Sequence, residues 1–313
     1  MLDYTTLRII WWLLLGFLLV GFAIMDGFDL GSVILLPVVA KNDIEKRIVL
    51  NAVGPVWEGN QVWIILGGGA IFAAWPYVYA ASFSGFYFAM FLVLVGFILR
   101  PVSFKYRSKM PGIKWRKTWD FLSMLSGLIP SLIFGVAIGN ILIGVPFHFD
   151  QLLHFYYTGS FWALLNPFSL LCGLLSVSML SMHGAVYLCN KTEDTLQNRC
   201  RSSVVLCAIF TMILFAAGGI WLQHIPGYEL TSVINTNAPS NPLYKTMAVA
   251  PKIWLENYRG HPILWTVPML AFLGAFLTIL LSFFKKYKTA MLSSSLTLAG
   301  IITSVGVSMF PVL

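Results

Sequence analysis

The sequence predicts an all-α integral membrane protein, polytopic, with about eight transmembrane helices. Of its 313 residues, 58% are hydrophobic and only 10% are charged, and the mean hydropathy is +0.81. This composition is far too apolar for a soluble globular domain. The apolar residues also gather in runs of about 20, which is the length that an α-helix needs to cross a bilayer. Lipid is therefore the expected solvent.

Eight runs meet this length criterion, and no stretch between them has the composition of a soluble domain. The first run continues through Asp26 and Asp29 and has no small-residue cleavage site, so we expect a retained helix instead of a signal peptide. In chain order, the predicted helices cover residues 9–38, 57–75, 77–99, 119–143, 162–189, 203–224, 262–284 and 290–310.

The positive charges predict how the helices are oriented. Most of the 20 Lys and Arg residues follow odd-numbered helices, as in the segments 100–117 and 285–288. Cytoplasmic loops of membrane proteins carry the excess of Lys and Arg. We therefore expect a multi-pass membrane protein with its N-terminus outside. The net charge of +8 reports this topology, and no nucleic-acid partner is expected.

A weak internal similarity suggests two halves. The segment LLLGFLLVGFAIMDG (13–27) aligns with LLCGLLSVSMLSMHG (170–184), which maps the first helix onto the fifth and Asp26 onto His183. We therefore expect an N-terminal four-helix half, residues 1–160, that carries a carboxylate cluster, and a C-terminal four-helix half, residues 161–313. Repeats of this kind are common in energy-converting membrane proteins and do not by themselves indicate a function.

Ionisable residues inside the predicted spans are the strongest functional signal. Asp26 and Asp29 are three residues apart on one helical face, Glu58 opens the second helix, and Arg100 closes the third. All four are expected near the cytoplasmic side. One interpretation is a structural ion cluster in which Arg100 neutralises a carboxylate, Asp29 in particular. The other is that at least one acid relays protons inward, because three acids face one base.

The remaining polar residues of these helices favour structural roles. Trp57, Asn60 and Gln61 are expected to make interhelical polar contacts, and tryptophans such as Trp63 are typical of membrane interfaces. His183 is the one histidine inside a predicted helix, and a hydrogen-bonded helix contact is favoured over haem ligation. No phosphate-binding, metal-binding or nucleophile motif occurs, so we expect neither a catalytic residue nor a metal site in this chain.

Several segments closely resemble subunit II of the cytochrome bd-type quinol oxidases. They are IIWWLLLGFLLVGFAIMDGFDLG, NAVGPVWEGNQVWIILGGGAIFAAWP, LRPVSFKYRSK, YYTGSFWALLNPFSLLCGLLSV and PILWTVP. The resemblance extends over the whole chain. It implies a haem-free subunit that pairs with a homologous subunit I, which carries haems b and d and oxidises quinol while oxygen is reduced to water. Small single-helix accessory subunits, membrane lipids and a structural quinone are further partners in this family.

Carried over by position, the resemblance assigns a cytoplasmic proton path to Asp26 or Asp29 and Glu58. It places Trp63 near a lateral entrance for oxygen and gives Arg100 the role of holding the acid cluster together. Many family members have Asp where this chain has Glu58, which keeps the acid. The family usually continues into a ninth helix, which we expect to be absent from this chain.

Two other functions fit the residues less well. A proton-coupled secondary transporter would use the same carboxylates, but it would be expected to show helices broken around a substrate site near the membrane midplane. The run GGGA at 67–70 is the one candidate break, and close helix packing explains it equally well. A purely structural scaffold subunit without a proton role is the third alternative.

Overall fold

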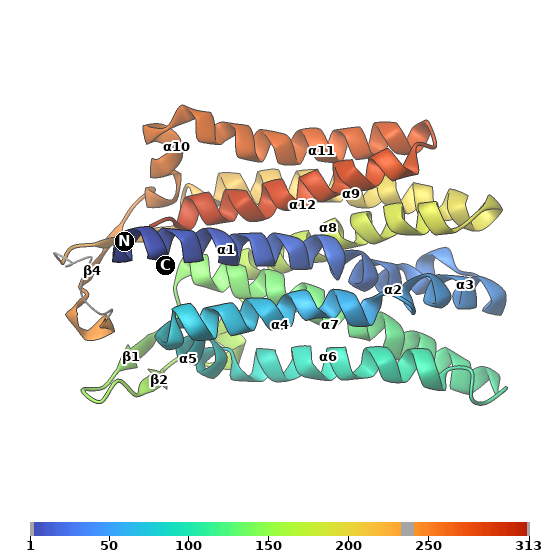
Figure 1. The fold of residues 1–313 in the computed structure, drawn as a ribbon, viewed down its shortest axis with the longest axis horizontal. Coiled ribbons are helices and arrows are strands. Elements are labelled where there is room, and N and C mark those ends of the chain that lie inside the picture. Colours follow the sequence, from blue (N-terminus) through green and yellow to red (C-terminus); the bar gives the residue numbers. More distant parts are fainter. Residues whose placement is uncertain (1–2, 233–240, 312–313) are drawn as a thin grey trace.

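The computed structural model, which describes residues 3–232 and 241–311, is a bundle of long helices that run side by side (Figure 1). The helices are α1 (Tyr4–Met25), α2 (Gly27–Val39), α3 (Asp43–Val53), α4 (Trp57–Ala74), α5 (Pro76–Gly85), α6 (Tyr87–Tyr106), α7 (Ile113–Ile143), α8 (Pro167–Lys191), α9 (Asp194–Leu222), α10 (Glu256–Gly260), α11 (Thr266–Phe283) and α12 (Tyr287–Met309).

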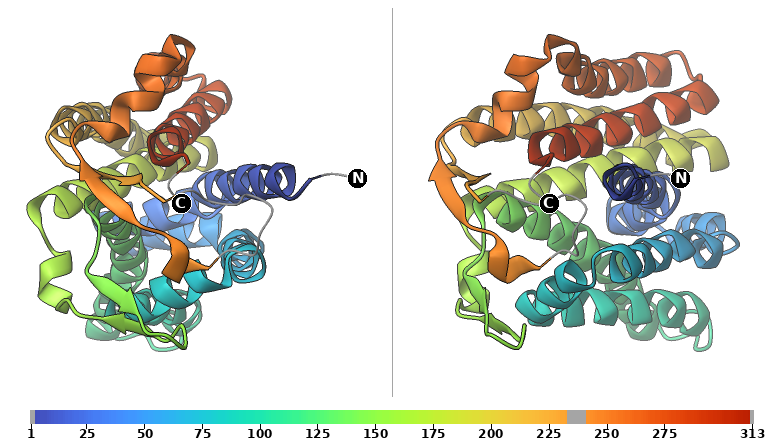
Figure 2. Two further views of the ribbon diagram at one scale, coloured as in Figure 1. Left: turned by 90° about the vertical axis from the view of Figure 1, so that its left-hand side faces the viewer. Right: turned by 60° about the vertical axis from the view of Figure 1, so that its left-hand side comes forward.

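Short elements connect these helices. They are the antiparallel hairpins β1 (Phe147–Phe149) with β2 (Phe155–Tyr157) and β3 (Gly227–Leu230) with β4 (Met247–Ala250), and the 3-10 turns η1 (Phe161–Leu164), η2 (Pro242–Tyr244), η3 (Ile253–Leu255) and η4 (Pro262–Trp265). Both hairpins lie at one end of the bundle (Figure 2). The two hairpins are the only departure from an all-α structure in the described part of the chain.

The prediction of a polytopic helical membrane protein is confirmed. Within the described residues, seven helical runs are long and apolar enough to cross a membrane, and α1 with α2 forms one of them, Tyr4–Val39. The helix α4 runs alongside the others without meeting the hydropathy criterion, because Glu58, Asn60 and Gln61 lie in its first two turns (Figure 1). The predicted count of eight is thus approximate.

Two predicted boundaries were wrong for local reasons. The expected helix over 77–99 is two helices, since α5 ends at Gly85 and α6 then runs from Tyr87 to Tyr106. The expected helix over 162–189 begins later, because Asn166 caps α8 by accepting from the Ser169 N–H and Pro167 occupies the first helical position. Asn at the cap and Pro directly after it are typical of a helix start.

The centre of the bundle is formed by α2 and α8, whose side chains are the most completely buried. Glycines allow backbones to touch here. A Cβ added to Gly127 of α7 would lie 2.6 Å from the Leu30 carbonyl oxygen of α2, and one on Gly135 would lie 2.3 Å from that of Cys172 in α8. Small residues at such contacts are the main device for packing helices in lipid, where apolar surface alone gives no preference for a protein neighbour. The division into halves at residue 160 stays a prediction.

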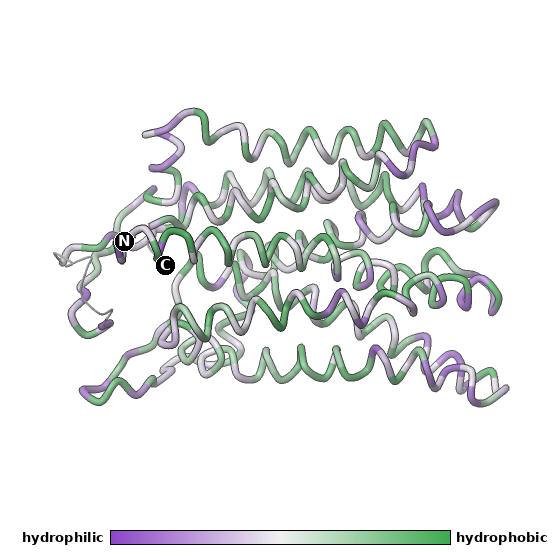
Figure 3. Tube along the Cα trace, viewed as in Figure 1, coloured by the Kyte–Doolittle hydropathy of each residue, from purple (hydrophilic) through white to green (hydrophobic). Residues whose placement is uncertain are grey.

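The two ends of the bundle differ in charge. Figure 3 shows hydrophilic residues at both ends, and one of these ends carries α3 and the α6–α7, α8–α9 and α11–α12 connections. We call this the basic end, because the Lys- and Arg-rich segments 100–117 and 285–288 lie there. The first and last described residues lie at the opposite end (Figure 1).

Candidate functional site

The candidate site begins with an interruption in the first membrane-crossing run. The helix α1 ends at Met25 and α2 begins at Gly27, with Asp26 between them at φ −82° and ψ −19°. Asp26 keeps two backbone hydrogen bonds, from its N–H to Phe22 at 2.9 Å and from the Leu30 N–H to its carbonyl at 3.0 Å. The helix is thus interrupted at Asp26, while the chain continues in the same general direction (Figure 1).

Asp26 forms a buried ion pair with Arg100 of α6. The guanidinium donates from Nη1 to Oδ1 at 2.5 Å and from Nη2 to Oδ2 at 3.4 Å, and both side chains have an exposed fraction of 0%. Arg100 also lies over the ring of Phe97, 5.1 Å from its centre. Two-pronged pairing of this kind fixes both orientation and charge.

Asp29 lies one turn further along, on α2, and has a different partner. The Asn60 side chain of α4 donates to its Oδ2 at 2.8 Å, while Oδ1 has no hydrogen-bond partner among the described residues. Asp29 is fully buried. The expected pairing of Asp29 with Arg100 is therefore wrong, because the guanidinium of α6 binds Asp26 at the α1–α2 junction, whereas Asp29 in α2 accepts from Asn60 of α4.

The arrangement leaves one acid charge without a contacting cation. Arg100 compensates Asp26, and the amide of Asn60 is neutral. An ionisable group in this position inside a membrane is a site at which a proton can be bound and released. Asp29 is thus the residue of this cluster whose geometry best fits proton exchange, and Asp26 with Arg100 forms its fixed neighbour.

Glu58 lies outside this hydrogen-bonded cluster. It is exposed at the start of α4, and the described residues offer its side chain neither an ion pair nor a hydrogen bond. Asn60, two residues later, is buried against Asp29, and two residues correspond to about 200° around a helix. Glu58 is therefore not joined to the cluster by a hydrogen bond or ion pair among the described residues, and its convergence with the other two acids near the cytoplasmic face stays a prediction.

The other singled-out residues of α4 lie along its contact with neighbouring helices. The Trp63 ring covers Gly21 of α1, where an added Cβ would lie 2.4 Å from it, and it meets Phe17 edge-on at 5.9 Å. Trp57 meets Phe104 of α6 edge-on at 6.3 Å. Gln61 is half-buried, and no hydrogen bond of its side chain is present in the described part of the chain.

An ion network at the basic end was missed by the sequence analysis. Arg107 donates to Asp120 at 2.5 Å and to Asp43 at 2.7 Å, Arg116 reaches Asp43 at 2.7 Å, and Lys46 reaches Asp120 at 2.9 Å. The network ties α3 to α6 and α7. The hydrogen bond from Arg107 holds the pKa of Asp43 below its ordinary value of 3.8. Only charged residues near one end were visible in the sequence, and their pairing depends on how α3 folds back.

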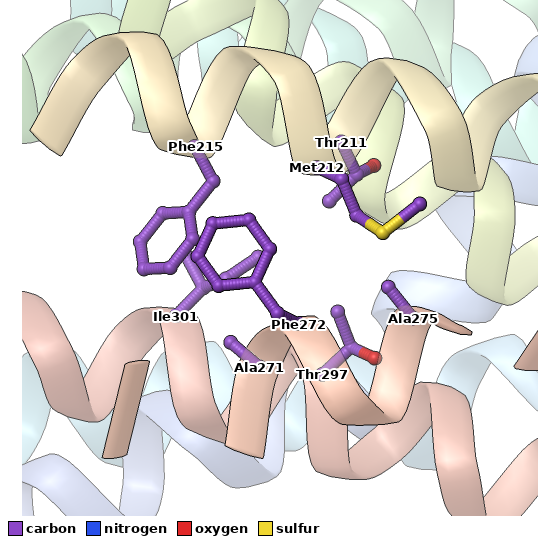
Figure 4. Close-up of a pocket in the computed structure, with 8 residues that line it drawn as sticks. All are labelled: Thr211, Met212, Phe215, Ala271, Phe272, Ala275, Thr297 and Ile301. Atoms are coloured by element: carbon purple, nitrogen blue, oxygen red, sulfur yellow. The ribbon is translucent and has the colours of Figure 1, made fainter. Parts of the chain in front are cut away.

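Two small spaces between helices are lined by apolar or weakly polar groups. Figure 4 shows the crevice between α9 and the α11–α12 pair, which the rings of Phe215 and Phe272 close with their centres 5.3 Å apart. A cavity of about 230 Å³ lies between α6, α7 and η1, lined by residues such as Phe86, Ile133 and Phe161. Neither is lined by a charged group, as a site for a charged solute would be.

The model of one protein family matches residues 7–313, and its description is cytochrome bd terminal oxidase subunit II. The chain belongs to this family. It is 50% identical to the probable cytochrome oxidase subunit 2 of Haemophilus influenzae and 48% identical to the cytochrome bd-I ubiquinol oxidase subunit 2 of Escherichia coli K12, over 99% of this chain and 82% of each relative. The family resemblance read from the sequence is thereby confirmed.

More distant relatives agree. Cytochrome bd ubiquinol oxidase subunit 2 of Bacillus subtilis is 34% identical over 68% of this chain and 62% of that protein. The structure of the bd oxidase from Geobacillus thermodenitrificans contains a chain that matches with a TM-score of 0.72 at 18% identity, over 98% of this chain and 85% of that one. At that identity the structural match supports the fold alone.

Proposed function

We propose that this chain is the haem-free subunit II of a bd-type quinol:oxygen oxidoreductase in a bacterial inner membrane. In the complex, quinol is oxidised and oxygen is reduced to water with haems b and d held by a homologous subunit I. The family membership supports this assignment. So does the match over 99% of this chain to a relative named as a ubiquinol oxidase subunit. The basic end of the bundle faces the cytoplasm in this proposal, which places the N-terminus outside.

The role proposed for this subunit is to bring protons from the cytoplasm toward the site of oxygen reduction. The observation that carries it is Asp29, a fully buried carboxyl with one oxygen unpartnered among the described residues, beside the Asp26–Arg100 pair. Asp29 lies nearer the basic end than the other end, because about ten helical residues separate it from Val39 at the end of α2. Glu58, exposed on α4 at the same end, would receive protons from water and pass them on.

The surface of α4 supports a contact with subunit I. Within the described residues α4 packs mainly against α1 and α5, and Val62, Ile65 and Phe72 on its other side are exposed. We place subunit I against this surface, so that Glu58 borders the subunit interface and Trp63 lies beside a lateral route for oxygen from the lipid. The fully apolar cavity between α6 and α7 suits a hydrocarbon chain, and a structural quinone would place its tail and not its ring there.

The test is Glu58→Gln in the purified two-subunit complex, with quinol-driven oxygen uptake and haem spectra measured together. We expect turnover to fall several-fold while haem content stays intact, because the amide cannot carry a proton. Glu229→Gln is the matched control, since it changes an exposed acid of β3 at the opposite end of the bundle. Unchanged turnover in Glu58→Gln would remove this residue from the path and favour a scaffold role.

A proton-coupled transporter remains a different class of function for the same acids. A complex purified with this chain decides between the two: haem that co-purifies with a partner subunit supports the oxidase, and a haem-free chain that transports a solute would support the transporter.

A further inference from the structure

We propose that His183 is a positioning residue for the acid cluster: it ties the junction between α1 and α2 to α8, and thereby directs Asp26 to Arg100 and Asp29 to Asn60. This inference rests on the proposed role of these acids in proton delivery. Its evidence is separate, because it comes from the backbone of the α1–α2 junction and from the contacts of the histidine ring.

The helix is interrupted between Ile24 and Phe28, because α1 ends at Met25 and α2 begins at Gly27. The Ile24 carbonyl oxygen, in the last turn of α1, lies 3.0 Å from Nε2 of His183 in α8. A helix interrupted inside a membrane needs neighbouring helices to hold its backbone groups, since lipid offers them no hydrogen bond. His183 supplies such a hydrogen bond two residues before Asp26.

The ring reaches this carbonyl because α2 and α8 touch backbone to backbone. A Cβ on Gly31 would lie 1.9 Å from the Leu180 carbonyl oxygen, and one on Gly184 would lie 2.4 Å from the Ser32 nitrogen. His183 directly precedes Gly184. This close contact of α2 with α8 therefore brings the imidazole to the α1–α2 junction, where it reaches the Ile24 carbonyl at the end of α1.

The ring is held at its other side by a third helix. Nδ1 lies 2.8 Å from the Ser294 hydroxyl of α12, and the side chain is completely buried. A backbone carbonyl has no proton to donate, so Nε2 carries the hydrogen, and Nδ1 of the neutral ring is left to accept from the Ser294 hydroxyl, which also lies 3.0 Å from the Met291 carbonyl oxygen. Both nitrogens are thus occupied by hydrogen bonds between helices, and the sequence-based expectation of a helix contact is confirmed.

The consequence for the acids follows from their positions. Asp26 and Asp29 are two and five residues beyond Ile24. Without the imidazole, the last turn of α1 loses its hydrogen bond to α8, and the junction is free to shift. A shift there would move both carboxyl groups away from the places where α6 and α4 now meet them. His183 acts on the acids through the backbone, and no hydrogen bond joins it to either acid among the described residues.

The experiment compares substitutions of His183 in the two-subunit complex. His183→Leu removes the donor, whereas His183→Gln keeps an amide N–H near the position of Nε2. We expect turnover to fall several-fold in His183→Leu, with a larger rate difference between H2O and D2O, and to recover in His183→Gln. Haem content should stay intact in both. Ser178→Ala is the matched control, because Ser178 of α8 also donates to a carbonyl of another helix, Cys207 at 2.9 Å, away from the α1–α2 junction; it should keep the wild-type rate.

A third substitution keeps the test decisive if His183→Leu does not assemble. His183→Asn carries its amide at the position of Nδ1, too short to reach the Ile24 carbonyl. We expect Asn to be slow where Gln is fast. Equal rates for Gln and Asn, or a wild-type rate and isotope effect in His183→Leu, would overturn the positioning role.

Asp29→Asn separates this inference from the proposed proton path. If Asp29→Asn is slow and the double variant with His183→Leu loses no further turnover, both residues act on one path. A slow Asp29→Asn variant beside a wild-type His183→Leu refutes the inference and keeps the path. A wild-type rate in Asp29→Asn refutes Asp29 as a proton carrier, and any remaining loss in His183→Leu then has another cause.

Discussion

Replacing Arg100 with methionine is expected to destabilise the protein strongly, because it leaves Asp26 in the membrane without its partner. Asp26 and Arg100 both have an exposed fraction of 0%, and Arg100 is the side chain that donates to Asp26 within the described residues. Methionine has an apolar side chain of similar length to the aliphatic part of arginine. The loss of stability therefore reports the missing ion pair more than a change in packing.

The magnitude follows from the burial of the pair. Removing one member of a buried ion pair costs about 3–5 kcal/mol, since the remaining charge is left uncompensated. At about 1.4 kcal/mol per factor of ten, the ratio of folded to unfolded subunit falls roughly a hundred-fold to a few thousand-fold. A loss of this size is comparable with the whole stability of many proteins, so little assembled complex should remain.

The assay is the yield and thermal stability of the haem-containing complex after detergent extraction. The double variant Asp26→Asn, Arg100→Met has no stranded charge and should recover most of the loss. Arg259→Met, an exposed arginine without an ion pair among the described residues, is the control and should behave as wild type. Normal assembly of Arg100→Met, or a double variant no better than the single one, would refute the reasoning.

Two further predictions concern other parts of the fold. Gly184→Val should reduce assembly and turnover together, because even a Cβ at this position would lie 2.4 Å from the Ser32 nitrogen of α2; Gly219→Val, with open space at its Cβ, should be tolerated in the same measurement. Acid should release α3, since Arg107 lowers the pKa of Asp43 from 3.8 and Arg199 lowers that of Glu45 from 4.5. A carboxyl group whose pKa is lowered by folding stabilises the folded state at pH values above its ordinary pKa. This stabilisation is lost as the pH falls through the lower pKa of the folded state. A spin label at Ile44→Cys should therefore gain mobility below about pH 4 and not between pH 5 and 7, and Asp43→Asn with Glu45→Gln should show the mobile spectrum at neutral pH already. Mobility independent of pH would contradict this clamp.

The membrane helices were predictable because their signal is local. A run of about 20 apolar residues needs no partner to be recognised, and all eight predicted runs have helical counterparts. The errors lie where neighbouring structure decides, as at Gly85, where one expected helix is two. The Asn166–Pro167 start of α8 was readable in the sequence and was overlooked.

The candidate site was predictable in its members and not in its pairing. Helical spacing drew attention to Asp26 and Asp29 together, both of which are buried, and the scarcity of charge in the spans drew attention to Arg100. Which acid meets the guanidinium depends on the helix interruption at Asp26, and the backbone beside it is contacted by His183, 159 positions away from Ile24. No local pattern contains that information.

By itself, the sequence determined that this chain is a helical membrane protein, which of its ends is basic, and which few ionisable groups lie inside the bilayer. These properties follow from the composition and from the spacing of residues along single helices, so they do not depend on which helices pack against each other. The tertiary structure alone decided that Arg100 binds Asp26, that Asp29 faces Asn60, and that Glu58 lies apart from them. Hydrogen bonds act over about 3 Å, and only the packing of α2 against α8 sets such distances between distant segments.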